Sequence, residues 1–206
     1  MTVRGEKTSQ GSDWDRVVKF ADVPVTGAGS LVVTNTAAGK LMDVTIVNGA
    51  NTATGLALAA AEEGTMLRFA DGANWAGTVV ANSHVALTNL TDGAATVTFG
   101  NLRLESGEFP LRLFRDESGA LTSDAVNLTG AVVKGEGDTG FIRLTGAEFT
   151  RDDKLSLGTA PAGAWANAVI KTASGLPLKI VESKPDEHGL VTVTGKIPTG
   201  FCITIQ

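Results

Sequence analysis

Residues 85–107 read VALTNLTDGAATVTFGNLRLESG, and this stretch alone indicates the fold class. Apolar side chains alternate with small or polar ones at Val85 and Leu87, and again at Val97 and Phe99. Successive side chains of a β-strand point to opposite faces, so an apolar period of two predicts half-buried strands. The stretch therefore predicts an all-β protein.

The alternation changes phase inside the same stretch. Val97 and Phe99 occupy odd positions, whereas Leu102 and Leu104 occupy even ones. A slip of one residue would turn the core face of a strand toward solvent unless the backbone compensates. We therefore predict a bulge or a corner at Gly100-Asn101.

The same pattern recurs along the rest of the chain. Further strands are predicted at Met42–Val47, Phe109–Phe114, Leu176–Ile180, Val191–Thr194 and Phe201–Gln206. Turn-forming dipeptides that end in glycine separate the strands: Asn48-Gly49, Asp71-Gly72, Asp92-Gly93, Ser106-Gly107, Ser118-Gly119 and Ser174-Gly175. Short strands at such regular spacing are typical of a sandwich, a barrel or a solenoid.

Three segments depart from this pattern. Leu56–Glu63 and Ala162–Thr172 are rich in alanine, a strong helix former, and are predicted as short helices that decorate the fold. Near the N-terminus, Ser12 followed by Asp15 is a capping pattern for a short helix. A first strand over Val17–Val23 is the preferred alternative there.

Composition limits the choice of partner. Apolar residues make up 43% of the 206 residues and tyrosine is absent, so the core is expected to consist of Val, Leu, Ile and Ala. The net charge of -5 counts against nucleic acid, because phosphate binding needs clustered Lys and Arg. The closest approach to such a cluster, Arg112 with Arg115, is followed by Asp116 and Glu117.

The same sequence pattern indicates the domain organisation. Residues 1–16 (MTVRGEKTSQGSDWDR) lack the apolar core of a signal peptide and are expected to form a flexible or capping segment. Residues 17–206 are expected to form one all-β domain, with an optional sub-boundary near 130–150 and a small C-terminal β cap. The longest apolar run, Leu56–Ala61, is far shorter than the roughly 20 residues of a membrane-spanning helix, so no membrane insertion is expected.

Two architectures fit the strand pattern. Small residues at turns, threonine-rich strands and few aromatics favour a right-handed parallel β-solenoid, in which successive coils stack closely. The hairpin-type dipeptides Asn48-Gly49 and Asp71-Gly72 favour an antiparallel β-sandwich or jelly roll. We prefer the solenoid and keep the sandwich as the alternative.

Five phrases carry a resemblance to a known family: GSLVVTNTAAG, MDVTIVNGANTATG, LRFADGANWAG, VALTNLTDGAATVTFGNLRLESG and DAVNLTGAVV. They resemble the passenger regions of bacterial autotransporters and related surface adhesins, over about half the chain. The resemblance is one of composition. It implies a β-helix at the cell surface or outside the cell, as part of a larger chain. No signal peptide and no outer-membrane barrel accompany the phrases, so a fragment or a C-terminal cap is expected.

The usual motifs of catalysis are not found. Gly39-Lys40 lacks the serine or threonine that a phosphate loop requires, because Leu41 follows. His84 and His188 have no second ligand at a metal-binding spacing, so no metal site and no cofactor are expected. The single Cys202 excludes an internal disulfide and has no histidine nearby in sequence.

Carboxylate-based sugar chemistry is the enzymatic option that stays open. The acidic pairs are Asp13 with Asp15, Glu62 with Glu63, Glu105 with Glu108, Asp152 with Asp153, and Asp186 with Glu187. Adjacent residues of a strand point to opposite faces, so no adjacent pair is a ready-made catalytic pair. We therefore do not expect an enzyme.

Two tryptophans are the candidate ligand-binding residues. Trp75 and Trp165 each lie among Ala, Asn and Gly, which would leave an indole face accessible for stacking on a sugar. We favour the other interpretation, in which both tryptophans cap the core ends of a coil.

These observations lead to one preferred function and two alternatives. The preferred one is a non-enzymatic structural or adhesive segment of a bacterial surface or secreted protein. The alternatives are a carbohydrate-binding or carbohydrate-active β domain and a phage or particle structural protein. A glycan or another protein is the expected partner, and the oligomeric state is left open.

Overall fold

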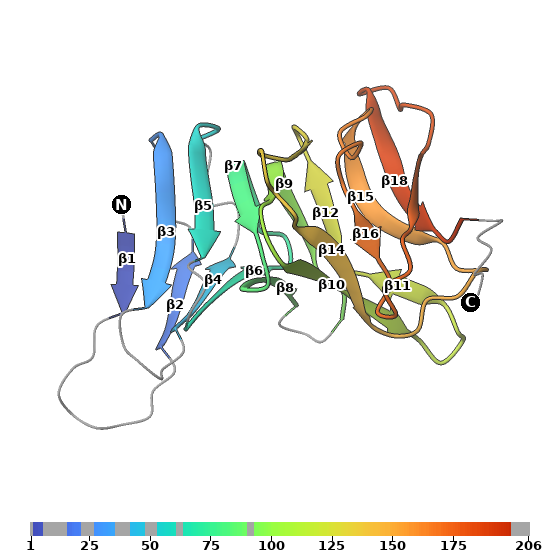
Figure 1. Ribbon diagram of the computed structural model, residues 1–206, viewed down its shortest axis with the longest axis horizontal. Helices are drawn as coiled ribbons and strands as arrows, with labels where there is room; N and C mark the ends of the chain where they lie inside the picture. Colours follow the sequence, from blue (N-terminus) through green and yellow to red (C-terminus); the bar gives the residue numbers. More distant parts are fainter. Residues whose placement is uncertain are drawn as a thin grey trace.

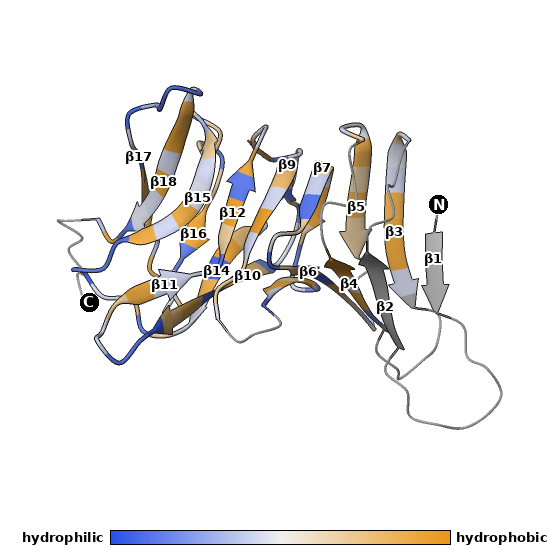
Figure 2. Cartoon of the chain, turned by 180° about the vertical axis from the view of Figure 1, so that it is seen from behind, coloured by the Kyte–Doolittle hydropathy of each residue, from blue (hydrophilic) through white to orange (hydrophobic). Residues whose placement is uncertain are grey.

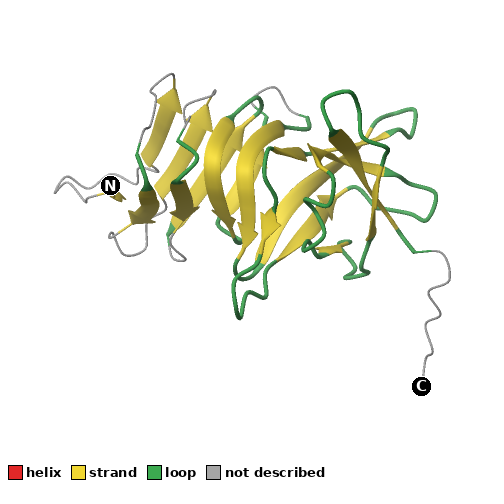
Figure 3. Cartoon of the chain, turned by 90° about the horizontal axis from the view of Figure 1, so that it is seen from above, coloured by secondary structure: helices red, strands yellow, loops and turns green. Residues whose placement is uncertain are grey.

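The computed structural model describes residues 2–5, 16–21, 27–35, 42–47, 53–60, 64–89 and 93–198. Within these ranges the chain forms strands joined by turns and no helix (Figure 3). The all-β class predicted from the period-two alternation is therefore confirmed.

Two parallel sheets form one end of the molecule and its middle (Figure 1). The first holds, in spatial order, β1 (Thr2–Gly5), β3 (Gly29–Asn35), β5 (Leu56–Ala60), β7 (Asn74–Ala81), β9 (Thr96–Leu104) and β12 (Ala125–Leu128). Its short strand β13 (Val132–Val133) also pairs with β9. The second holds β2 (Arg16–Ala21), β4 (Met42–Val47), β6 (Thr65–Ala70) and β8 (Val85–Thr88). From β1 to β9 the chain passes from one sheet to the other at every step.

Two smaller sheets follow toward the C-terminal end. In one, β10 (Glu108–Arg115), β14 (Phe141–Gly146) and β16 (Ile170–Lys171) are parallel, and β11 (Leu121–Ser123) pairs with β10 in the antiparallel sense. In the other, β15 (Leu155–Pro161), β18 (Leu190–Lys196) and β17 (Lys179–Glu182) are antiparallel. Purely parallel pairing thus gives way to antiparallel pairing at this end of the chain.

The parallel register aligns buried side chains into columns across the first sheet. One column consists of Leu31, Leu58, Val79, Leu102 and Val132, each of them the register partner of the next. All five are buried. Apolar residues therefore recur at alternate positions along neighbouring strands (orange in Figure 2). In-register stacking of branched aliphatic side chains removes their apolar surface from water along the column.

The second sheet carries matching columns. Its two columns are Val44, Leu67 and Val85, and Ile46, Phe69 and Leu87. Phe69 meets Phe99 of the first sheet edge to face, with ring centroids 4.7 Å apart. The two sheets thus share one hydrophobic core, which continues to Val193 in β18.

The predicted phase slip is confirmed in β9. Phe99 and Gly100 are both buried, although they are neighbours, and the register between β7 and β9 shifts between Trp75 and Thr78. A Cβ on Gly100 would lie 2.0 Å from the carbonyl oxygen of Ala76. Only glycine allows this close backbone approach, and it explains why the slip occurs at that residue.

Both alanine-rich helix predictions are wrong. Leu56–Ala60 is strand β5, held between β3 and β7, because two neighbouring strands outweigh the local helix propensity of leucine and alanine. Residues 162–167 form turns, and Ile170–Lys171 is strand β16. At the N-terminus, β2 agrees with the preferred first strand, while Ser12 and Asp15 lie outside the described residues.

Most of the predicted strands are confirmed. They are found at Met42–Val47 and in β8, β10 and β18. The strand predicted from Leu176 begins only at Lys179, because residues 173–175 turn the chain back on itself. Gly72 and Gly119 have φ angles of 77° and 85°, which confirms two of the predicted glycine turns. The predicted strand Phe201–Gln206 and the Asn48-Gly49 turn lie outside the described residues.

Candidate functional site

Trp75 belongs to the core of the parallel sheets. Its side chain has no exposed surface, and its indole Nε1–H donates to the carbonyl oxygen of Leu56 at 3.1 Å. Trp75 is also the register partner of Phe99 in β9. The expectation of an accessible indole face is wrong here, because the residue sits at an inward position of β7.

Trp165 lies in the turns that follow β15 and also has no exposed surface. Its environment differs from that of Trp75 in one respect. Its Nε1 is buried and has no hydrogen-bond acceptor among the described residues. The expectation of an exposed stacking face is wrong for this tryptophan too, but its indole N–H is left with unused hydrogen-bonding capacity.

A hollow of about 470 Å³ lies between the turns around Trp165 and strand β17. Its lining consists of Trp165, Ala166, Ala168, Leu178, Ile180 and Glu182. Both carboxylate oxygens of Glu182 accept from the backbone N–H of Gly163 at 3.0 Å. This contact joins the two walls of the hollow. The tryptophan candidate of the sequence therefore borders a concave surface, whereas Glu182 was not predicted.

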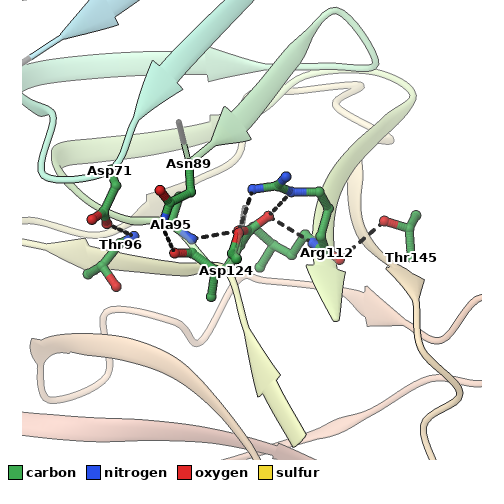
Figure 4. Close-up of polar contacts among 10 residues, drawn as sticks. Asp71, Asn89, Ala95, Thr96, Arg112, Asp124 and Thr145 are labelled. Carbon is green, nitrogen blue, oxygen red and sulfur yellow. Dashed lines mark hydrogen bonds and ion pairs between the residues drawn. The ribbon is translucent and has the colours of Figure 1, made fainter. Parts of the chain in front are cut away.

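Asp124 is a buried carboxylate with several hydrogen-bond partners (Figure 4). It was not identified from the sequence. Its side chain has no exposed surface and accepts from the backbone N–H groups of Ala95 at 2.8 Å and Arg112 at 3.0 Å. The guanidinium of Arg112 completes the site with Nε at 2.9 Å and Nη2 at 3.0 Å. Arg112 Nη2 also donates to the carbonyl oxygen of Gly93.

This arrangement ties three segments of the chain together, because donors from two of them satisfy the carboxylate of the third. The turn at Gly93–Ala95, strand β10 and the link between β11 and β12 meet at one carboxylate (Figure 4). A buried charge is tolerated only when it is paired and hydrogen-bonded, and both conditions hold. The site is therefore suited to holding the junction between the parallel sheets and β10 in place. Neither carboxylate oxygen of Asp124 is left free to bind a substrate.

Other arginines join segments that are distant in sequence. Arg143 donates to Glu108 at 2.6 Å, and this contact is the main reason why the pKa of Glu108 lies below its usual value. Arg103 likewise lowers the pKa of Asp138, helped by the backbone N–H of Gly135. These carboxylates are held in their ionised form.

Of the acidic pair Asp152 and Asp153, Asp152 is exposed, whereas Asp153 is partly buried and paired with Arg115. Arg115 donates to Asp153 at 2.7 Å and, with the Thr150 backbone N–H, lowers the pKa of Asp153 to about 2. A general acid for glycoside hydrolysis needs a raised pKa, so the shift at Asp153 has the opposite direction.

The remaining sequence candidates do not converge. His84 Nδ1 lies 3.2 Å from the carbonyl oxygen of Thr65, and exposed His188 lies 3.5 Å from Glu187. In the part of the chain that the structure describes, no group of three or more His, Cys, Asp or Glu side chains could hold a metal ion. The other candidates, Asp13, Asp15, Glu62, Glu63 and Cys202, lie outside the described residues.

Comparison with known proteins returned no relative. No family model matches the chain, and neither a curated protein nor a solved structure matches it. Among the described residues, no helix is long and apolar enough to span a membrane. Function is therefore inferred from the sequence and the geometry of the chain itself.

Proposed function

We propose that this chain is a parallel β-solenoid that serves as a non-enzymatic structural segment of a bacterial surface protein. The observation that carries the proposal is the column Leu31, Leu58, Val79, Leu102 and Val132, together with the alternation of the chain between two parallel sheets. Two consecutive strands then make up one coil, and each coil stacks on the one before. Such proteins gain their stability from contacts between neighbouring coils.

The charged surface supports the same role. Asp43 of β4 meets Arg68 of the neighbouring strand β6 at 2.7 Å, and Glu108 of β10 meets Arg143 of β14 at 2.6 Å. The partners are 25 and 35 residues apart in sequence. Each pair therefore joins one step of the stack to the next. Single exposed pairs contribute little, but a series of them favours one register.

The surface location rests on two further supports. The sequence phrases resemble passenger regions of bacterial autotransporters and surface adhesins, and the net charge of -5 suits a segment displayed in water. A stack of coils is also a natural spacer, since its length grows with each added coil while its cross-section stays constant. The segment would thus hold other parts of the surface protein away from the cell.

Immunolabelling tests the surface role. Antibodies raised against residues 93–198 are expected to label intact cells of the source organism as strongly as permeabilised cells. Brief treatment of intact cells with an added protease should remove the signal. Labelling that appears only after permeabilisation would contradict the proposal.

A further inference from the structure

The hollow beside Trp165 has features that a purely structural role does not use. Leu178 and Ile180 are only partly buried, although both pack against the main core. Ile180 and Glu182 occupy alternate positions of β17 and so share one face of the strand. The hollow therefore presents apolar surface and one carboxylate side by side.

Two residues that line the hollow carry polar groups with unused hydrogen-bonding capacity. The buried Nε1–H of Trp165 has no acceptor among the described residues, and leaving such a donor unpaired is unfavourable. Within the described part of the chain, the carboxylate of Glu182 accepts only from the Gly163 N–H, whereas an ionised carboxylate offers about four lone-pair sites. A ligand that both donates to Glu182 and accepts from Trp165 would satisfy both groups.

The charge of the lining residues limits which class of ligand the hollow can bind. Among the described residues that line the hollow, Glu182 is the only charged one, and none is a lysine or an arginine. An anionic ligand would be repelled by the carboxylate, while a purely apolar one would leave it without donors. A neutral molecule with hydroxyl groups and an apolar C–H face matches both requirements. The hollow has a volume of about 470 Å³ and is largely open to solvent.

We propose that this hollow binds one residue of a neutral saccharide. The C–H face of the sugar packs on Leu178 and Ile180, one hydroxyl donates to Glu182, and an oxygen accepts from Trp165 Nε1. Trp165 contributes its N–H edge and not a stacking face, because its side chain has no exposed surface. Contact with Nε1 therefore requires a small displacement of the turns at residues 162–168. This function is additional to the structural role and does not depend on it.

The test measures binding of the purified chain to neutral and acidic oligosaccharides. The probes are β-glucan, mannan and galactan oligomers, with oligogalacturonate as the acidic comparison. Isothermal titration gives the affinity, and intrinsic tryptophan fluorescence reports the displacement at Trp165. At least one neutral oligomer is expected to bind and to change the fluorescence, whereas oligogalacturonate is not.

Four variants assign the binding to the hollow. Glu182→Gln removes the charge with little change of shape, and Trp165→Phe removes the unpaired donor; each is expected to weaken binding at least tenfold. Ala166→Arg places a long side chain at an exposed lining position, and so should abolish binding without disturbing the core. Trp75→Phe is the matched control, since its indole N–H is already bonded to Leu56 and lies outside the hollow's lining.

Circular dichroism of each variant separates loss of fold from loss of binding, and Ala166→Arg decides the case if Trp165→Phe fails to fold. The proposal is overturned if no neutral oligomer binds at millimolar concentration, or if oligogalacturonate binds equally well. It is also overturned if Ala166→Arg and Glu182→Gln bind as tightly as the parent chain.

Discussion

The middle of the parallel sheets and strand β17, at the edge of the C-terminal antiparallel sheet, bury their side chains to different extents. In the middle of the parallel sheets, strands have neighbours on both sides, and Leu58, Val79 and Leu102 have no exposed surface. In the antiparallel sheet, β17 pairs with β18 alone among the described strands, and Ile180 is only partly buried. The difference belongs to β17 and not to the whole sheet, because Leu157 of the other edge strand β15 has no exposed surface.

This difference in burial indicates which region contributes most to stability and which region is suited to bind a ligand. Hydrophobic stabilisation scales with the apolar area removed from water, so the columns of the parallel sheets contribute most of it. The hollow lies where that packing becomes incomplete, against the partly buried β17. Regions of lower local stability are also the ones that adjust to ligands.

The largest effect is expected from shortening a side chain inside the column. Leu102→Ala should lower the free energy of unfolding by about 3 kcal/mol, because it leaves a cavity between Val79 and Val132. Ile180→Ala, in the partly buried strand β17, should lower the free energy of unfolding by less than half as much. Urea unfolding followed by circular dichroism measures both. Equal costs would remove the distinction between the two regions.

Gly158 connects the two regions and provides the next test. Its φ is 129°, and a Cβ there would lie 2.3 Å from the carbonyl oxygen of Val126 in β12. Gly158→Ala should cost about 2 kcal/mol through steric overlap and strain. Hydrogen exchange should increase in β15, β17 and β18 but not in β5–β9.

The matched control is Gly163→Ala, where φ is 77° and no atom lies within 4 Å of the added Cβ. This change should cost only about 1 kcal/mol, the conformational penalty alone. If both variants lose the same stability, the close contact between β12 and β15 contributes nothing.

Asp124→Asn should have a smaller but clear effect. It keeps the shape of the side chain and removes the charge that Arg112 and two backbone N–H groups share, for an expected loss of about 1.5 kcal/mol. Asp116→Asn in an exposed turn is the control and should lose less. Thermal unfolding of the two variants measures the difference. The account of the junction fails if Asp116→Asn is the more damaging change.

The smallest effect on stability is expected at acidic pH. The pKa of Asp153 falls from 3.8 to about 2 because of Arg115 and Thr150, so its ionised form stabilises the fold above pH 4. That stabilisation is lost as the pH falls from about 4 to about 2. The stability difference between the parent chain and Asp153→Asn should therefore shrink over this window. A difference that stays constant with pH would contradict the assignment.

The sequence predicted some of the strands whose two faces differ in polarity and missed others, among them β6 and β14. β8, β10 and β18 show clean alternation because only one face of each is buried. The slip at Gly100 was also predictable, since an out-of-phase strand must bulge. Leu56–Ala60 was misread because its local composition favours helix, and the neighbouring strands that override this preference lie far away in sequence.

The sites were less predictable than the strands. Asp124 meets Ala95 and Arg112, which are 29 and 12 residues away, and no local motif marks such a junction. Trp165 was singled out, but its partner across the hollow, Glu182, comes from a strand whose position depends on β18. Contacts between distant segments are set by register, and the register is not encoded in any single stretch.

Methyl–methyl nuclear Overhauser contacts test the in-register stack most directly. With selectively labelled Leu and Val, the stack predicts contacts between Leu31 and Leu58, Leu58 and Val79, Val79 and Leu102, and Leu102 and Val132. Each methyl group should thus contact the one before and the one after it in the column. An antiparallel sandwich would instead pair strands that are consecutive in sequence, and contacts of that kind without the column would contradict the parallel stack.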